Sequence, residues 1–283
     1  MEEEKNTVPQ KMDYIDLREV MAKKNPKLPK LLPGFIIRYL ERVIHVKEIN
    51  EFLAENRDKF GLDFVDAVIE NFGAIVKTEG EENIPREGRF IFASNHPLGG
   101  LDGLALIQVV GRIRKDLLFP VNDILMNISN LKELFIPINK HGSNLENARI
   151  IDETFAGEKT MLYFPAGLCS RKQNNKIVDL TWHKTFISKA KKHQRDVVPV
   201  YIEGRNSNFF YNLANLRTKL GIKANIEMLF LVDEMFKQKN QTIFIKFGQP
   251  IPYTAFNRSK KDKEWAKYVK KKVYELGNRQ IEE

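Results

Sequence analysis

Apolar and polar positions alternate along much of the chain in patterns that predict strands and helices. Residues 90–93, 160–164 and 197–202 form short apolar runs bounded by polar or turn-forming residues, which is typical of buried strands. Between these runs, residues 144–156 and 181–193 repeat apolar side chains at helical spacing. Strands that alternate with helices predict an α/β fold, with a mixed, largely parallel sheet flanked by helices.

The same patterns predict further elements on both sides of these segments. Additional strands are expected at residues 75–78, 117–121, 135–138 and 242–247. Additional helices are expected at residues 103–110, 208–220, 224–236 and 262–277. Because the segment 224–236 is very apolar, we interpret it as a buried helix.

The first part of the chain predicts a helical arm in front of this α/β region. Helical spacing is found in residues 14–22, 35–53 and 62–72. The helix over 35–53 carries basic residues and is amphipathic, so it either lies on a membrane or packs on the α/β region. Its single histidine, His45, is expected to be structural.

A proline-rich stretch interrupts the arm. Residues 23–33 contain three prolines, which exclude a continuous helix, and they mix four lysines with three leucines. Such a stretch suits an anionic interface, and the alternative is a plain connector. We therefore divide the chain into an N-terminal helical membrane-associating arm, residues 1–73, and a domain that spans residues 74–283.

Composition narrows the class of protein. With 283 residues, of which 42% are hydrophobic and 29% charged, the chain is expected to fold around a sizeable core. Cys169 is the only cysteine, so an internal disulfide is excluded and a reducing compartment is favoured. We see no signal-peptide pattern and no apolar run near the roughly 18 residues of a spanning helix. These observations predict a cytoplasmic protein, peripheral on the inner face of the cell membrane.

The net charge of +9 suits three kinds of partner: nucleic acid, an anionic membrane surface or acidic small molecules. No recognised nucleic-acid-binding pattern is present, so we expect no nucleic acid partner. The lysine- and leucine-containing stretch favours the anionic membrane surface. The sequence also contains no phosphate-binding loop, no dinucleotide fingerprint and no metal-ligand spacing, so neither a metal nor a cofactor is expected.

The chemistry of the chain concentrates around His96. The preceding strand ends at a turn over residues 95–100, and Asp102 opens the next helix, so His96 is placed at the mouth of the sheet with a carboxylate behind it. A histidine beside a carboxylate is the usual pairing for a general base. Cys169 has no activating neighbour in the sequence, and we do not interpret it as a nucleophile.

These residues and three later blocks resemble the glycerolipid acyltransferase superfamily. The first block is Asn95-His96 with Asp102, and the others are residues 133–140, 163–171 and 197–202, in the order of that family. Each block alone is a weak signal, but four in order over roughly residues 74–250 are a specific one. Two variants, five residues between His96 and Asp102 and an alanine at Ala166 where the family has glutamate, resemble the hemolysin-like and the ornithine- and glycine-lipid O-acyltransferase branch.

The resemblance implies an O-acyltransferase that works in lipid biosynthesis. Its acyl chain would come from an acyl thioester and would pass to the hydroxyl of a lysolipid. The co-substrate would be acyl-carrier protein or coenzyme A that carries the acyl chain (acyl-ACP or acyl-CoA). The lysolipid would be of the lysophosphatidic acid type or an N-acyl amino-acid lipid. His96 would be the general base and Asp102 would orient it. The apolar segment 224–236 then has a second interpretation, as the wall of an acyl-chain tunnel.

The same resemblance implies a set of substrate-binding residues. Asn95 is expected to position the catalytic pair, and Gly99 and Gly100 to bring a backbone N–H to the oxyanion. The third block would bind the acceptor's anion, with Arg171 as a two-point donor to phosphate or carboxylate and Lys140 as a weaker candidate. The full predicted set is Asn95, Gly99, Gly100, Lys140, Phe164, Pro165, Gly167, Ser170 and Arg171.

Two other functions remain open from the sequence. A hydrolase would use His96 and Asp102 with Ser94 or Cys169, although the Gly-x-Ser-x-Gly elbow is missing. A non-catalytic basic protein that binds membranes would use none of these residues for chemistry.

Overall fold

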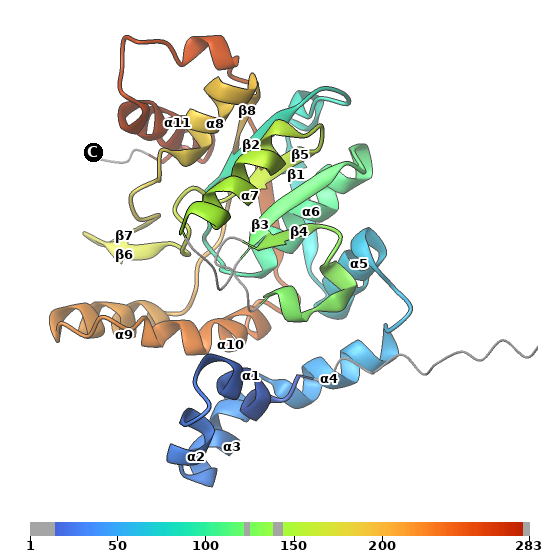
Figure 1. Ribbon diagram of the computed structural model, residues 1–283, viewed down its shortest axis with the longest axis vertical. Coiled ribbons are helices and arrows are strands. Elements are labelled where there is room, and N and C mark those ends of the chain that lie inside the picture. Colours follow the sequence, from blue (N-terminus) through green and yellow to red (C-terminus); the bar gives the residue numbers. More distant parts are fainter. Residues whose placement is uncertain (1–14, 122–124, 138–143, 280–283) are drawn as a thin grey trace, which may run out of the picture.

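The structure is a computed structural model, and it describes residues 15–121, 125–137 and 144–279 (Figure 1). Seven strands form one sheet in the order β1-β9-β8-β2-β5-β3-β4. Their bounds are β1 Ile75–Glu79, β2 Phe90–Ser94, β3 Leu117–Val121, β4 Phe135–Pro137, β5 Thr160–Tyr163, β8 Asp196–Ile202 and β9 Thr242–Phe247. Each of these strands lies at or within two residues of its predicted position, because short apolar runs between turn-forming residues have few other ways to be buried.

The sheet is mixed and largely parallel, as predicted. Neighbouring strands run parallel throughout, except for β8 and β9, which pair antiparallel with Val200 opposite Phe247. The carboxyl ends of β2, β5 and β8 therefore lie at one edge of the sheet, where ligands bind in open α/β sheets.

Helices cover both faces of the sheet. On one face, α5 (Gly61–Asn71) and α6 (Leu101–Ile113) pack against alternate side chains of the strands, such as Phe92 and Val198. On the other face, α8 (Thr185–His193) and α11 (Asp262–Leu276) pack against the intervening positions, such as Ile91. The 13-residue α7 (Asn144–Ala156) lies beside α8. This period of two explains why the central strands are apolar at nearly every position.

A second, two-stranded sheet was not predicted. It is a hairpin of β6 (Arg171–Gln173) and β7 (Lys176–Val178), which projects from the carboxyl edge of the main sheet (Figure 1). Asn174 and Asn175 both have positive φ at its two-residue turn. Consecutive asparagines tolerate this left-handed backbone and are the sequence signal that marks the hairpin.

The arm consists of α1 (Leu17–Lys24), α2 (Leu28–Leu31), α3 (Gly34–Val43) and α4 (Val46–Glu55). The predicted single helix over residues 35–53 is therefore wrong: it breaks at His45, whose φ is +54°. The His45 Nε2 lies 3.1 Å from Asp233 Oδ1, and its ring stacks on Phe236 with centroids 3.9 Å apart. These contacts fit the structural role expected of His45 and join the arm to α10 (Leu231–Phe236).

The helix α5 precedes the predicted division at residue 73, yet it belongs with the sheet. Its side chains Phe64, Val65 and Val68 are buried in the same core as β2 and β8. The division of the chain after residue 73 stays a prediction, and the packing assigns α5 to the sheet domain.

The segment 224–236 is not one buried apolar helix, so that prediction was wrong. It forms a 3₁₀ helix, η4 (Ile226–Phe230), followed by the short α10. Its fully buried side chains are Glu227 and Glu234, whereas Leu229 is 46% exposed. Hydrophobic periodicity did not reveal this arrangement, because it assumes that the apolar side chains face the interior. Here the two glutamates face the interior, where they have hydrogen-bond or ion-pair partners, and Leu229 faces solvent.

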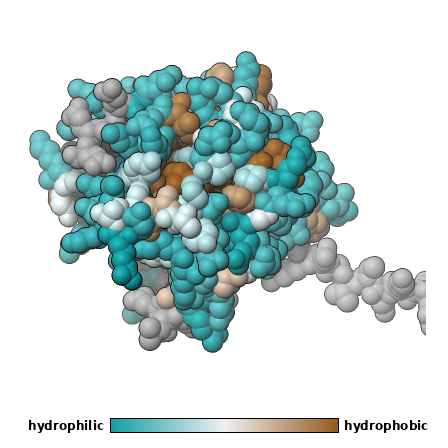
Figure 2. All heavy atoms as spheres, turned by 90° about the horizontal axis from the view of Figure 1, so that it is seen from above, coloured by the Kyte–Doolittle hydropathy of each residue, from teal (hydrophilic) through white to brown (hydrophobic). Residues whose placement is uncertain are grey.

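The helix α9 (Asn208–Lys219) and α10 lie below the sheet in Figure 1, and the arm lies below them. Figure 2 shows the molecule from the opposite, upper side, where the surface is mainly hydrophilic and apolar side chains form small separate groups. Among the described residues, no helix has the length and apolar character needed to cross a bilayer.

Candidate functional site

The turn that carries His96 begins where β2 ends. The buried Asn95 side chain donates from Nδ2 to the Ile202 carbonyl at 2.8 Å, and its Oδ1 accepts from the Ile202 N–H at 2.7 Å. Asn95 therefore joins the end of β2 to the end of β8 in the way that a backbone partner would. The structure thus gives Asn95 a positioning role in the protein, and its predicted contact with substrate stays a prediction.

The five-residue spacing still brings His96 and Asp102 together. The His96 Nδ1 lies 2.9 Å from Asp102 Oδ2, with Asp102 fully buried and the His96 side chain 15% exposed. Gly99, with φ at +81°, supplies the sharp reversal that brings the helix start back towards His96. The Gly99–Gly100 turn therefore brings His96 and Asp102 within hydrogen-bond distance although five residues separate them.

Asp102 is held as a carboxylate. Burial opposes its charge, but His96 and the backbone N–H groups of Leu98 and Gly99, at 2.8 and 3.2 Å, outweigh burial and hold the pKa of Asp102 below its ordinary value. Because this carboxylate accepts from Nδ1, the neutral His96 ring carries its proton there and its lone pair on Nε2. No residue that the structure describes hydrogen-bonds that second nitrogen.

Phe164 fixes the plane of the His96 ring. The two rings are stacked, with centroids 4.0 Å apart and 19° between their planes, and Phe119 packs edge-on against Phe164. Since β5 lies next to β2, the residue that follows β5 reaches the His96 turn directly. The structure therefore brings the third sequence block to the first one.

A third buried residue, Asp179, ties the His96 turn down from behind. Its Oδ1 accepts from the His96 backbone N–H at 3.2 Å and from Ser170 Oγ at 2.6 Å, and its Oδ2 accepts from Trp182 Nε1 at 2.8 Å. The backbone N–H of Asp179 in turn donates to Tyr274 Oη at 2.7 Å. Asp179 thus connects the turn to Ser170 just before the hairpin, to Trp182 just before α8 and to Tyr274 of α11.

The buried position of Asp179 disfavours its ionised form. Burial raises the pKa of Asp179, and the hydrogen bonds from Ser170, Trp182 and His96 only partly offset that effect. Sequence reasoning missed this residue, because it stands in an irregular segment after β7 and matches no motif. The only signal available was an acidic residue, Asp179, three positions before a tryptophan, Trp182.

Arg171 is turned into the protein. It is buried, and its guanidinium lies 2.8 Å from Glu227 Oε1 and 2.6 Å from the Cys169 carbonyl, with its Cζ 5.1 Å from the centroid of the Phe210 ring. Glu227 is fully buried and also pairs with Arg217 at 2.8 Å. These contacts occupy the two-point donor surface of Arg171, so they favour a role in holding η4 rather than in holding an acceptor anion. Its predicted head-group contact stays a prediction.

The other predicted binding residues differ in how they face solvent. Ser170 is buried, and its N–H donates to the His96 carbonyl at 2.7 Å, so it supports the turn. Pro165 is buried and accepts from the His183 N–H, whereas Gly167 is exposed with φ at +68°. Lys140 lies outside the described residues.

The sequence profile of the acyltransferase family matches residues 19–281, which is most of the chain. The chain belongs to the acyltransferase family. This match includes the arm from α1 onwards as well as the sheet domain. It confirms the predicted superfamily and the prediction of an acyltransferase enzyme.

Two relatives of this acyltransferase have curated names. It is 49% identical over 264 residues to a lyso-glycine lipid O-acyltransferase of Bacteroides thetaiotaomicron, covering 93% of this chain and 97% of that one. It is 45% identical over 264 residues to a lyso-glycine lipid O-acyltransferase of Phocaeicola vulgatus, covering 93% and 95% of the two chains. Both names agree with the prediction of O-acyl transfer.

Among solved structures, the acyltransferase is similar to the 1-acyl-sn-glycerophosphate acyltransferase PlsC of Thermotoga maritima. The TM-score is 0.49 at 18% identity, with 94% of this chain and 96% of that chain covered. The fold class of the present chain rests on its own sheet topology.

The state of Cys169 and the arrangement of possible metal ligands also bear on its chemistry. The Cys169 thiol is buried, and burial raises its pKa to about 11 although Arg171 acts in the other direction. Within residues 15–121, 125–137 and 144–279, no group of three or more His, Cys, Asp or Glu side chains is arranged to hold a metal ion.

Proposed function

We propose that the protein is a lysolipid O-acyltransferase that uses His96 as general base and an acyl thioester as donor. The observation that carries this proposal is the His96–Asp102 pair, 2.9 Å apart at the carboxyl edge of the sheet, with the basic Nε2 of His96 left for substrate. The family match supports the reaction class, and the geometry supports the assignment of roles.

The reaction follows from the state of the two side chains. The acceptor hydroxyl loses its proton to His96 Nε2 as its oxygen attacks the thioester carbonyl carbon. The charged imidazole is stabilised by Asp102, whose pKa is held low, so Asp102 stays ionised throughout. When the carbon–sulfur bond breaks, the leaving thiolate takes the proton back from Nε2, and His96 is neutral again.

The tetrahedral intermediate also needs a donor for its oxyanion. The Gly99 N–H already donates to Asp102 Oδ2, so it is not the donor. The Gly100 N–H follows it at the start of α6, where backbone N–H groups and the helix dipole favour negative charge. We assign the oxyanion contact to Gly100.

The acceptor is proposed to be a lyso-glycine lipid. Two relatives at 49% and 45% identity, each covered almost over its full length, carry that activity in their names. The variants that separate this chain from other lysolipid acyltransferases, the longer His96–Asp102 spacing and Ala166, point to the same branch. Ala166 is buried, which leaves no side chain there for a polar contact with an acceptor.

A lipid substrate requires the enzyme to meet a membrane, and we propose peripheral association through the arm. Leu31, Phe35 and Tyr39 are 73%, 65% and 51% exposed on α2 and α3, which is unusual for large apolar side chains. The cationic side chains of Lys27, Lys30 and Arg38 are exposed in the same region. Exposed apolar side chains among cations are typical of surfaces that bind anionic lipid.

The hydrolase alternative has less support. It would need Ser94 or Cys169 as a nucleophile, and both are fully buried. The Ser94 hydroxyl donates to the Asn95 carbonyl at 2.9 Å, and the raised pKa of Cys169 keeps its thiol neutral. Direct attack by the acceptor hydroxyl requires neither.

Substitution of His96 tests the proposal. In His96→Ala, acyl transfer to a lyso-glycine lipid should fall by about 10² to 10⁴, the usual effect of losing a general base. His183→Ala serves as the control, because His183 is an exposed histidine and should leave the rate unchanged. Transfer would be followed by mass measurement of the acylated lipid, and circular dichroism would confirm that both variants fold. A His96 variant that keeps more than half of the wild-type rate would remove His96 from the mechanism.

A further inference from the structure

A cavity of about 580 Å³ lies where the β6–β7 hairpin, the segment after β8 and the end of α11 meet. Among the residues that the structure describes, its lining includes three cationic side chains and one carboxylate. The lining residues are Asn175, Lys176, Ile177, Val178, Glu203, Gly204, Arg205 and Arg279. The two arginines of this lining, Arg205 and Arg279, outnumber its one carboxylate, Glu203, so the cavity favours an anionic ligand.

Two of the residues that line this cavity lie close to the His96 turn. Gly204 lies so close to Leu98 of that turn that a Cβ on Gly204 would stand 2.7 Å from Leu98 Cδ2. Val178 is followed directly by Asp179, which accepts from the His96 backbone N–H. A ligand held in the cavity would therefore be next to the His96 turn.

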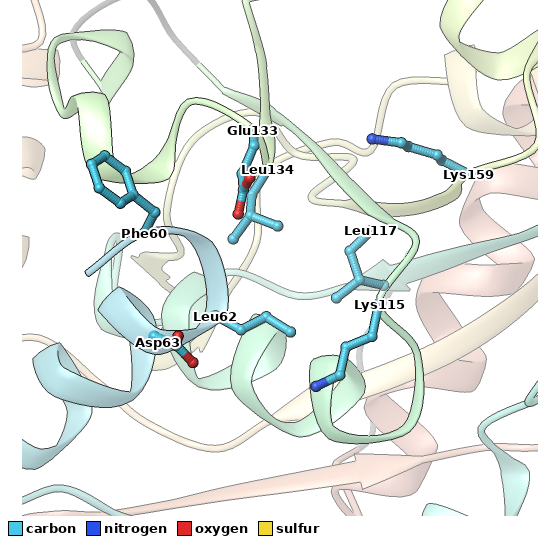
Figure 3. A pocket seen from close by; sticks show the side chains of 8 residues that line it. All are labelled: Phe60, Leu62, Asp63, Lys115, Leu117, Glu133, Leu134 and Lys159. Atoms are coloured by element: carbon cyan, nitrogen blue, oxygen red, sulfur yellow. The ribbon is translucent and has the colours of Figure 1, made fainter. Parts of the chain in front are cut away.

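A second cavity provides a contrast. It has a volume of about 370 Å³ and lies where β3 and β5 begin (Figure 3). Because β5 runs parallel to β2, whose carboxyl end leads to His96, this is the opposite edge of the sheet from His96. Its charged side chains are Asp63, Lys115, Glu133 and Lys159, two of each sign. The charges in this cavity balance, so a cationic lining is not a general feature of hollows on this basic protein.

The two guanidinium groups of the cationic cavity keep their charge available. Arg205 contacts neutral groups, donating to Asn208 Oδ1 at 2.6 Å, and Arg279 lies over the ring of Tyr201 with its Cζ 5.8 Å from the centroid. Both arginines are exposed, and neither pairs with a carboxylate among the residues that the structure describes. Arginine in this state suits the two-point recognition of a phosphate group.

We infer that this cavity binds the phosphate-bearing end of the thioester donor. The inference rests on the proposed function, which requires two substrates at His96. The acceptor is a lipid and suits the side where apolar Leu231 and Met235 of α10 contact Gly99 and Gly100. The cationic cavity adjoins the turn through Gly204, which lies against Leu98, and its charge suits the polar end of the second substrate. In coenzyme A and in a carrier protein alike, the pantetheine arm is joined to phosphate at the end away from the thioester, so either source fits this chemistry.

Direct binding tests the inference without relying on catalysis. Binding of free coenzyme A and of a phosphopantetheine-loaded acyl-carrier protein would be measured by titration calorimetry with the wild-type protein. The variants Arg205→Glu and Arg279→Glu should weaken binding of at least one probe by about ten- to a hundredfold, the effect of losing a charge-assisted contact. Lys159→Glu is the matched control, since it makes the same charge change in the second cavity and should leave binding unchanged.

Kinetics then separates the two substrates. In Arg205→Glu and Arg279→Glu the donor KM should rise about ten- to a hundredfold, with the acceptor KM and kcat near wild-type values. A rise in the acceptor KM instead would overturn the assignment to the donor. Equal weakening by Lys159→Glu would mean that overall charge is responsible, and it would also overturn the inference. Binding that depends on Arg205 and Arg279 in a protein without transferase activity would support the site while the proposed function failed.

Discussion

At the scale of single residues, the site is a set of buried polar groups that each have a specific partner. Asn95 holds Ile202, Asp102 holds His96, and Asp179 holds the backbone of the His96 turn. Only the His96 ring is left partly open to solvent. Most residues of the motif therefore hold the turn in place, and the His96 ring is the group left to meet a substrate in the proposed mechanism.

Arg171 provides the sharpest test at this scale. Arg171→Ala should lower the free energy of unfolding by about 3 to 5 kcal/mol, because it leaves Glu227 buried with a weaker set of partners. The pairing of Glu227 with Arg217 places the expected loss at the lower end of that range. Urea unfolding would measure it, with the exposed Arg149→Ala as control.

Two further variants, Glu227→Gln and Arg171→Lys, distinguish the two roles considered for Arg171. If Arg171 holds η4 in place, Glu227→Gln should also destabilise the protein and the acceptor KM should stay near its wild-type value in a folded Arg171→Lys variant. A stable Arg171→Lys protein with a tenfold higher acceptor KM would instead support the head-group contact.

The thiol of Cys169 gives a prediction about pH. Because burial raises its pKa to about 11 from an ordinary value near 9, less thiolate is present in the folded protein than in the unfolded chain at any pH below 11. Alkylation by iodoacetamide at pH 8 to 9 should therefore be much slower in native protein than in protein unfolded by guanidinium. Cys169→Ala should retain acyl transfer. Rapid native alkylation with loss of activity would contradict both expectations.

At the scale of elements, the His96 turn depends on the packing of α10. Gly99 has φ at +81°, and a Cβ there would collide with the side chain of Leu231. Gly100 lies against Met235 of the same helix. The α10 helix is thus a support for the turn as well as the link to the arm through His45 and Asp233.

Gly99→Ala should therefore reduce acyl transfer more than it reduces stability. The added methyl group faces both a strained backbone and Leu231, at a cost of about 1 to 3 kcal/mol for the backbone alone. The double variant Gly99→Ala with Leu231→Ala should recover part of the activity, because it removes the collision and leaves only the strain. Product formation and thermal unfolding would be measured side by side. No recovery in the double variant would show that α10 does not support the turn.

The elements also show how far the sequence could predict the structure. Apolar runs and helical spacing were enough for the seven strands of the main sheet and for α7, because those patterns are set by burial on two faces. They failed at residues 224–236, where Glu227 and Glu234 are the buried side chains. They also failed at the break beside His45. Both failures depend on partners distant in the sequence, Arg171 for Glu227 and Asp233 for His45.

For the site, the order of motifs predicted that His96 and Asp102 meet, and the structure brings these two side chains and the third block together. It could not separate residues that bind substrate from residues that hold the turn. Asn95, Ser170 and Arg171 are buried in contacts with the protein, and their position in a motif gives no sign of this. Asp179 was missed because its partners are backbone atoms and residues from four separate segments.

At the scale of the whole molecule, exposed apolar side chains gather on the arm and on the α9–η4 segment. Leu216, Leu220 and Leu229 are 52%, 64% and 46% exposed on that segment, and α3 contacts η4. The upper face in Figure 2 is mainly hydrophilic by comparison. The molecule therefore has two unlike sides, with the His96 edge of the sheet towards the apolar one.

Vesicle flotation tests whether this side binds lipid. Binding to anionic vesicles should fall as salt rises from 0.05 to about 0.5 M, because attraction between exposed charges is screened beyond about 10 Å at 0.1 M. Phe35→Glu should weaken binding, whereas Phe60→Glu, at a position 47% exposed beside the second cavity, should not. Equal binding to neutral vesicles at every salt concentration would contradict the electrostatic part of the proposal.

The pair of hydrogen bonds between Asn95 and Ile202 has a consequence for local unfolding. The Ile202 amide proton is held by a side chain of the His96 turn, so its exchange with solvent deuterium reports the integrity of that turn. If the turn could open while the sheet stayed intact, this amide would exchange faster than those of Val198 and Val200 in the same strand. The position of Asn95 between two central strands favours the other outcome, in which the turn and the middle of the sheet open together as one cooperative unit.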